Sequence, residues 1–459
     1  MSPTAVERLA QTPAMQRLPH QLRDPFILNS LISSGGNFFA GLAGFAFQAL
    51  LASALGGERY SEVASLISIF YMIQILHFVA MAVAARLTAP LASEGRHSEA
   101  QRVYRDLVIY ASLVGAVGMG LFILVSPTLH AQLRIGLGPL LILSATVPLN
   151  LLLGVSRGVV QGEQRFVPLS ANFIIYGATT LVFLPVLLRF QLHAVGATLA
   201  IVLALALCNL AATLSLRDLP RGGHHGRLEL PGVVRSSLAA AAGPGIVTVF
   251  FNMDVILAKY FLPNAQAGIY SAMSLLGKIL YFGTISISVV MFPRIAALHA
   301  QGKSPHKTVN LSLALVVGAG LCVVAVYFAV PDLVVRLLLR KSEYLQIGRN
   351  LGIYSLAMLG LAVANLLVYY FVAVHRRRYV FAMALGAVAF FGGIARFHSG
   401  FAQVALDVTV ANNIMALALL AMYLVDHPRS GLEDPEGTLG VEEVLPVPPN
   451  VAGAPGAGS

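Results

Sequence analysis

Charged side chains are scarce in this chain, and their scarcity limits the classes of protein to which it can belong. Only 11% of the 459 residues are Asp, Glu, Lys or Arg, whereas 57% are hydrophobic. A soluble protein carries about 25% charged residues, and a surface exposed to water cannot be built from so few. The charged residues lie in clusters between apolar runs of about 20 residues, the length that crosses a bilayer as a helix. Lipid is therefore the solvent for most of the chain.

Cysteines and catalytic motifs are also scarce. The two cysteines, Cys208 and Cys322, lie in different apolar runs, and neither has a second cysteine nearby that would form a metal or redox motif. The sequence contains no Gly-rich phosphate loop followed by Lys and Ser or Thr, no metal-spaced set of His and Cys, and no nucleophile elbow. We therefore expect a protein that is not an enzyme and that binds no metal or organic cofactor.

Windows of about 19 residues identify the apolar runs that are long enough to span a membrane. They lie at 27–51, 61–84, 107–126, 137–155, 166–188, 194–214, 236–258, 268–293, 309–330, 348–373, 379–395 and 401–424. This pattern predicts an all-α polytopic membrane protein with about twelve transmembrane helices.

The Lys and Arg residues between the runs predict the orientation, because basic loops are retained in the cytoplasm. The side that carries both termini holds about twice as many of them as the other side, so we expect both termini in the cytoplasm and a location in the bacterial inner membrane. The segment 331–347 opposes this trend, since Arg336, Arg340 and Lys341 lie on the other side. The net charge of +10 follows from topology, and we expect no nucleic acid partner.

A polar segment rich in Gly, Pro and Arg, at 216–235, divides the runs into two halves and predicts a flexible cytoplasmic linker. The halves are alike: Arg86-Leu87-Thr88-Ala89 ends the second run, and Arg294-Ile295-Ala296-Ala297 ends the eighth. Parallel repeats of this kind predict two pseudo-symmetric six-helix lobes around a central cavity. The expected boundaries are a leader at 1–26, an N-lobe at 27–215, the linker at 216–235, a C-lobe at 236–425 and a disordered tail at 426–459.

Lys278 is the most unusual residue within the runs, because an ionisable group costs about 3 kcal/mol or more at the bilayer centre. It lies about ten residues, or about 15 Å, into the eighth run, which places it close to the midplane. One interpretation is a positive charge that lines the cavity and binds an anionic group of the substrate. The other is a lysine that is paired within the helix bundle.

Other polar residues in the runs are further candidates. Asn252 and Asp254 can bind sugar hydroxyls or a coupling cation, unless Asp254 is an interfacial carboxylate. An imidazole ordinarily titrates near neutral pH, so His77 is a second coupling candidate, although it can equally join helices by a hydrogen bond. Asn37 and Gln48 lie in a first run that contains several glycines, a composition that suits either a pliable helix facing the cavity or close helix packing.

The stretch Asn252–Ala258, followed by Leu262-Pro263, Ala267–Ala272 and Phe292-Pro293-Arg294, resembles a pattern of the polysaccharide and O-antigen flippases. These flippases belong to the multidrug/oligosaccharidyl-lipid/polysaccharide exporter superfamily. The resemblance implies a flippase that moves a polyprenyl-pyrophosphate-linked oligosaccharide across the inner membrane by alternating access, for surface polysaccharide biosynthesis. It implies the lipid-linked glycan, membrane lipids, and a polysaccharide polymerase with its chain-length machinery as partners. A proton or a sodium ion would be the coupling ion.

The resemblance also adds Ser274 to the substrate-binding candidates, because a basic residue of the related lipid II flippases aligns there. Lys278 lies one turn later on the same helical face, a departure that argues against a peptidoglycan precursor as the substrate. A cation-coupled multidrug antiporter of the same superfamily is the main alternative, and a lysine at the midplane opposes cationic drugs. A membrane-embedded glycan polymerase or glycosyltransferase is more remote, since the segment 331–347 holds only Asp332 and Glu343 as acids.

Overall fold

The computed structural model describes residues 25–220 and 230–426, which fold almost entirely as helices. The helices are α2 (Pro25–Leu55), α3 (Gly57–Ser93), α4 (His97–Leu133), α5 (Leu137–Ser144), α6 (Thr146–Gly162), α7 (Phe166–Arg189), α8 (His193–Ser215), α9 (Leu230–Phe261), α10 (Asn264–Ala300), α11 (His306–Ala329), α12 (Pro331–Leu339), α13 (Asn350–Ala373), α14 (Tyr379–Arg396) and α15 (Phe401–Asp426), with a 3₁₀ helix, η3 (Ser342–Ile347). Twelve candidate membrane spans occur in the described residues, and α5 and α6 together make one of them. The chain is a multi-pass membrane protein, as predicted.

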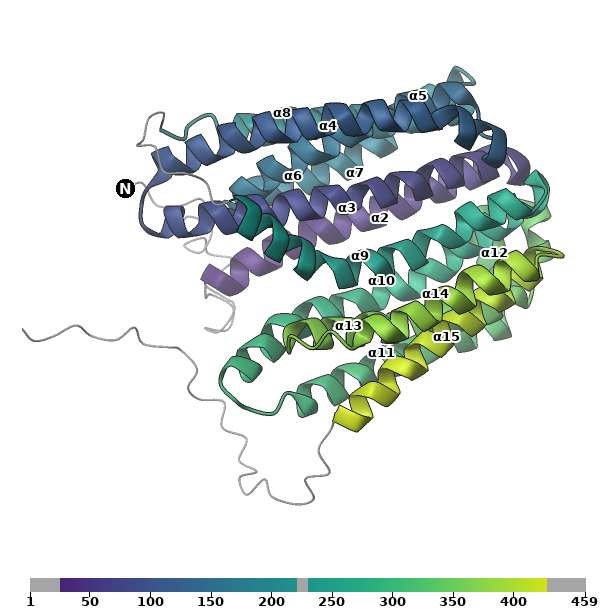
Figure 1. Ribbon diagram of the computed structural model, residues 1–459. Helices are drawn as coiled ribbons and strands as arrows, with labels where there is room; N and C mark the ends of the chain where they lie inside the picture. Colours follow the sequence, from purple (N-terminus) through teal and green to yellow (C-terminus); the bar gives the residue numbers. More distant parts are fainter. Residues whose placement is uncertain (1–24, 221–229, 427–459) are drawn as a thin grey trace, which may run out of the picture.

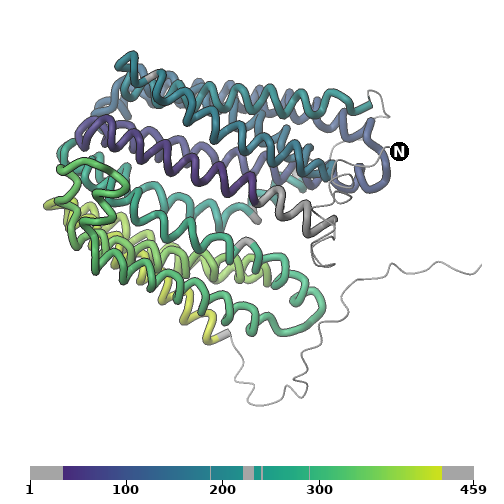
Figure 2. Tube along the Cα trace, turned by 180° about the vertical axis from the view of Figure 1, so that it is seen from behind, coloured from purple at the N-terminus to yellow at the C-terminus, as the bar shows by residue number. Residues whose placement is uncertain are grey.

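Helices α2 to α8 form an N-lobe and helices α9 to α15 form a C-lobe, which lie side by side (Figure 1). The lobes converge at the end that holds the α2–α3 turn and α12, which we call the far end. They diverge towards the start of α2 and the end of α15, which we call the termini end, and the view from behind agrees (Figure 2). The predicted leader and tail fall mostly outside the described residues.

Several helices extend well beyond the apolar runs. Helices α3, α4 and α10 have 37 residues each, or about 55 Å at 1.5 Å per residue, against about 30 Å of hydrocarbon. Arg86, Arg102 and Arg294, which lie just outside the predicted runs 61–84, 107–126 and 268–293, are therefore on helices. The window ends at the first charged residues, but arginine is a good helix former and the helix continues through them.

The predicted linker at 216–235 is also too long, because α9 already begins at Leu230. At the start of the segment 216–235, the Asp218 carboxylate accepts a hydrogen bond of 2.7 Å from the Arg165 guanidinium. This contact holds the pKa of the Asp218 carboxyl below its ordinary value. The turn after α8 is therefore tied to the start of α7.

The segment 331–347 is not an open loop, which corrects the expectation from sequence. It forms α12 and η3, in which Val335, Leu339 and Tyr344 are buried while Arg336 and Arg340 stay exposed. The Tyr344 hydroxyl donates a 3.0 Å hydrogen bond to the Ala52 carbonyl at the end of α2. A helix of this length is too short for a 19-residue window to detect, so the sequence revealed only its basic residues.

Three glycines on one face of α6 allow it to pack closely against α3. Gly154, Gly158 and Gly162 are spaced four residues apart, and a Cβ atom added at Gly158 would overlap the carbonyl oxygen of Met81 on α3. The Cβ would meet backbone, which cannot move aside as a flexible side chain can. Small residues at this spacing bring helix backbones together in membranes, and this contact is central to the N-lobe.

Replacing Gly158 with Leu is therefore expected to destabilise the N-lobe by about 1–3 kcal/mol, the usual effect of overpacking. The measurement is the melting temperature of the detergent-purified protein. The matched control is Gly120→Leu on α4, where an added Cβ meets no atom within 4 Å. Equal melting temperatures for the two variants would contradict close packing between α3 and α6.

Candidate functional site

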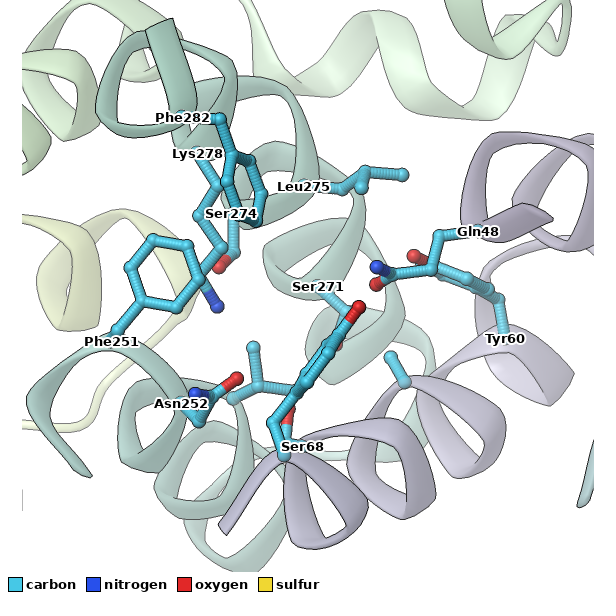
Figure 3. A pocket seen from close by; sticks show the side chains of 13 residues that line it. Gln48, Tyr60, Ser68, Phe251, Asn252, Ser271, Ser274, Leu275, Lys278 and Phe282 are labelled. Atoms are coloured by element: carbon cyan, nitrogen blue, oxygen red, sulfur yellow. The ribbon is translucent and has the colours of Figure 1, made fainter. Parts of the chain in front are cut away.

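A small pocket with about 20 Å³ of water-accessible space lies between the lobes, where α2 and α3 face α9 and α10 (Figure 3). Its lining residues are Gln48, Tyr60, Ala64, Ser68, Tyr71, Phe251, Asn252, Val255, Ser271, Ser274, Leu275, Lys278 and Phe282. Among these described residues Lys278 alone is charged, and the polar remainder carries amide or hydroxyl groups. The pocket therefore combines neutral polar and aromatic side chains with a single cation.

Lys278 both lines this pocket and is paired within the bundle. Its Nζ atom lies 3.4 Å from Oδ1 of Asp254 and 4.7 Å from the centre of the Phe251 ring. Figure 3 shows the ammonium beside this ring. Because side chains of a helix point towards its N-terminus, Lys278 reaches back along α10 to the level of Asp254. Each of the two interpretations drawn from the sequence describes part of its environment.

Asp254 is held by hydroxyl groups as well as by the lysine. Its Oδ2 atom accepts hydrogen bonds from Tyr354 at 2.6 Å, Ser274 at 3.0 Å and Tyr270 at 3.2 Å. The side chain is fully buried in the C-lobe, so the alternative of an exposed interfacial carboxylate does not fit. A coupling cation at Asp254 would have to displace Lys278 from Oδ1.

The structure brings some of the predicted site residues together and separates others. Gln48, Asn252 and Ser274 line the pocket with Lys278. Asn37 is exposed and shares a face of α2 with Gln48, but it lies about 16 Å nearer the termini end, since about eleven residues separate the two. His77 is buried inside the N-lobe, where its Nδ1 atom lies 3.1 Å from the Asn150 carbonyl oxygen, and it does not line the pocket.

The sequence interpretation missed the aromatic members of the site. Tyr270, Ser274 and Lys278 are spaced four residues apart on α10, so one helical face carries three of the groups around Asp254. This spacing was visible in the sequence and could have predicted Tyr270. Tyr354 comes from α13, and no local pattern connects it with Asp254.

Arg157 needs a further correction, because it lies between the predicted runs 137–155 and 166–188, where a loop was expected, and the structure buries it in the N-lobe on α6. Its Nε donates a 2.8 Å hydrogen bond to Oδ1 of Asn172, and its guanidinium lies 4.3 Å from the centre of the Phe173 ring. It is absent from the described lining of the pocket between the lobes. We interpret it as a link between α6 and α7.

At the far end, direct contacts between the lobes close the path from the pocket. The Gly57 amide donates to Oε1 of Glu343 at 3.0 Å, and Nζ of Lys259 donates to Oγ of Ser61 at 2.7 Å. Gly268 on α10 packs so closely on Gly57 that an added Cβ would overlap the Gly57 carbonyl. The pocket is therefore shut off from the far end.

Comparisons with known proteins agree with this architecture. No protein-family model and no curated protein matches the sequence. Among solved structures, an inward-facing multidrug resistance MATE family transporter of the MOP superfamily matches with a TM-score of 0.72 and 13% identity, over 84% of this chain and 94% of that chain. The lipid II flippase MurJ, in an inward closed conformation, matches with a TM-score of 0.70 and 16% identity, over 86% and 87%. The chain has the fold of these transporters.

An outward-facing MATE family transporter of the MOP superfamily matches this fold less well, with a TM-score of 0.61 and 14% identity, over 86% of this chain and 94% of that chain. In this chain, contacts join the lobes at the far end, and the lobes diverge at the termini end (Figure 1).

Proposed function

We propose that this chain is a flippase that moves a lipid-linked oligosaccharide across the inner membrane, with the pyrophosphate bound at Lys278. One observation supports this function above others: the described lining of the pocket holds one cation and no carboxylate, among amides, hydroxyls and aromatic rings. Such groups suit an anionic phosphate and sugar hydroxyls. A pyrophosphate cannot enter hydrocarbon unless polar groups replace its water, and this lining would supply them.

The pocket volume indicates how the substrate would lie. In the described conformation its water-accessible space is only about 20 Å³, room for about one water molecule, so a pyrophosphate would enter only when the lobes move apart. The glycan would extend towards the termini end, where the lobes diverge (Figure 1), which is the cytoplasmic side in this proposal. Rocking of the lobes would then open the far end and release the glycan there by alternating access.

The pair of Lys278 and Asp254 suggests how transport would be coupled to an ion. A pyrophosphate that binds the Lys278 ammonium competes with the Asp254 carboxylate, and a buried carboxylate without a cation is strongly destabilising. Asp254 would then take up a proton or a sodium ion, and it would return the ion when Lys278 pairs with it again. The coupling ion and the Lys278 ammonium would thus bind the Asp254 carboxylate in turn.

The multidrug antiporter is less well supported by the site. A cationic drug in the pocket would meet the Lys278 ammonium, and the nearest carboxylate, Asp254, is already bound by that lysine and three hydroxyls. A carboxylate that is free to bind drugs would have to line the pocket, and the described lining includes none.

The test is a flipping assay in proteoliposomes that contain a fluorescent polyprenyl-pyrophosphate oligosaccharide. The fraction of glycan that an added glycosidase can reach measures transport. Lys278→Gln is expected to lower the rate about 10- to 100-fold, since charged hydrogen bonds contribute about 1.5–3 kcal/mol. Lys303→Gln, which removes an exposed lysine at the termini end, is the matched control and should leave the rate unchanged.

Export of a fluorescent cationic dye is measured in the same vesicles. Dye export without glycan flipping would replace the flippase with the antiporter. A wild-type flipping rate in Lys278→Gln would remove Lys278 from the substrate site.

A further inference from the structure

A second, larger cavity lies on the N-lobe, away from the interface between the lobes. It has about 710 Å³ of accessible space, is open to the surface, and is lined by residues of α4, α6 and α8. Helices α4 and α8 both pack on α6, so α6 forms the floor of the cavity. Figure 1 shows α4 and α8 along the outer edge of the N-lobe. We call this cavity the α4–α8 pocket.

The half of the α4–α8 pocket nearer the termini end is basic. Arg102 and Arg105 lie in the early turns of α4, and none of the described lining residues is acidic. Arg105 also lies 3.7 Å from Asp106, but its side chain is 69% exposed, so solvent weakens this pair. Arg102 also has an interaction of its own within the chain. An anion would therefore bind two guanidinium groups near the helix ends in addition to, or in place of, the contacts that they already make.

Towards the far end the walls of the α4–α8 pocket become apolar. Val108, Leu152 and Leu210 line this half. Beyond them, Leu113 on α4 and Leu207 on α8 are exposed on the surface of the bundle, where a membrane protein meets lipid chains. The lining thus passes from basic and polar groups near the helix ends to mostly apolar groups deeper in the bundle, as headgroup and acyl chains do in a membrane leaflet.

Polar groups line the floor of the pocket at the level of the two arginines. The Tyr104 hydroxyl lies 3.3 Å from Oγ of Ser156 and 3.4 Å from Oγ1 of Thr213, and these contacts join α4 to α6 and α8. Gln101 lines the pocket, and its buried Oε1 atom has no hydrogen-bond partner among the residues that the structure describes.

We propose that the α4–α8 pocket binds one anionic phospholipid of the leaflet at the termini end, with its phosphate between Arg102 and Arg105. An acyl chain of this lipid follows Val108 and Leu210. Basic pockets between transmembrane helices suit anionic lipid headgroups. A soluble phosphate would satisfy the arginines but would leave the apolar half empty.

The experiment is native mass spectrometry of the detergent-purified full chain, titrated with phosphatidylglycerol or phosphatidylcholine. The expected result is one tightly retained phosphatidylglycerol and no comparable phosphatidylcholine. Arg102→Gln/Arg105→Gln is expected to weaken phosphatidylglycerol binding about thirtyfold, from about 1 kcal/mol for each basic residue. Lys303→Gln/Lys307→Gln, which removes two exposed cations at the same end, is the matched control and should bind as the wild type does.

Equal binding by both double variants, or equal binding of the two lipids, would overturn the proposal. Displacement of the retained lipid by millimolar glycerol phosphate would show a site for soluble phosphate and would also overturn it. A photoactivatable phosphatidylglycerol tests the wild type independently of the variants. Its label should map to α4 and α8, and a label confined to the C-lobe would reject the pocket.

Discussion

Replacing Lys278 with Met is expected to destabilise the protein by about 3–5 kcal/mol, and adding Asp254→Asn to the same chain is expected to restore most of that stability. Loss of one partner leaves the other charge buried and unpaired, whereas loss of both leaves a neutral amide that the hydroxyls can still bind. Asp254 is fully buried, so water cannot replace the ammonium that lies 3.4 Å away.

Melting temperatures of the two single variants and the double variant measure this effect. The flipping assay then separates stability from function, because the double variant should melt as the wild type does and still fail to flip the glycan. Recovery of flipping in the double variant would show that the pair only holds the helices together. Unchanged stability of Lys278→Met would show that the pair contributes nothing to the fold.

The same series tests the proposed ion exchange at Asp254. In Lys278→Met the buried carboxylate has no cation, so a coupling ion that binds there should stabilise the variant. If sodium is the coupling ion, added sodium is expected to raise the melting temperature of Lys278→Met. If the proton is the coupling ion, a lower pH is expected to raise it. Lys278→Met/Asp254→Asn is the control and should respond to neither. No response in Lys278→Met would reject Asp254 as the coupling site.

Gly268→Leu is expected to hold the far end of the protein open. Gly268 packs on Gly57, and an added side chain would overlap the Gly57 carbonyl, which belongs to backbone and cannot turn aside. The lobes would have to separate there, with loss of the contacts of Glu343 and Lys259 across the interface. Conformers of transporters differ by a few kcal/mol, so such a clash can reverse their populations.

Cysteine accessibility measures this shift. Ser61→Cys, introduced with Ser at both native cysteine positions, places a thiol at a buried position beside Lys259. A membrane-impermeant maleimide should label this thiol at least about tenfold faster in Gly268→Leu. Flipping should fall, since the protein would stay in the state with the far end open and could not complete the transport cycle. Gly283→Leu, on the same helix with no atom within 4 Å of an added Cβ, is the control. Equal labelling of both variants would contradict the closure at the far end.

The polytopic helical fold was predictable from the sequence, because spanning hydrocarbon imposes a length and a composition that each run shows by itself. Lys278 was identifiable for the same reason, since a charge in the middle of such a run is costly wherever its neighbours lie. The extensions of α3 and α10 and the short α12 were not predictable, because charged or short helices give no hydropathy signal.

Sequence alone determined that lipid surrounds this chain and that Lys278 requires a partner. Which partner it has was decided by the tertiary structure, which places Asp254 of α9 and Tyr354 of α13 around one face of α10. It also buried Arg157, which the sequence placed in a loop, and kept His77 away from the pocket. The cost of placing a residue in hydrocarbon depends on its own side chain and on the local run, which the sequence shows. Hydrogen bonds and ion pairs depend on the packing of helices that are distant in the chain.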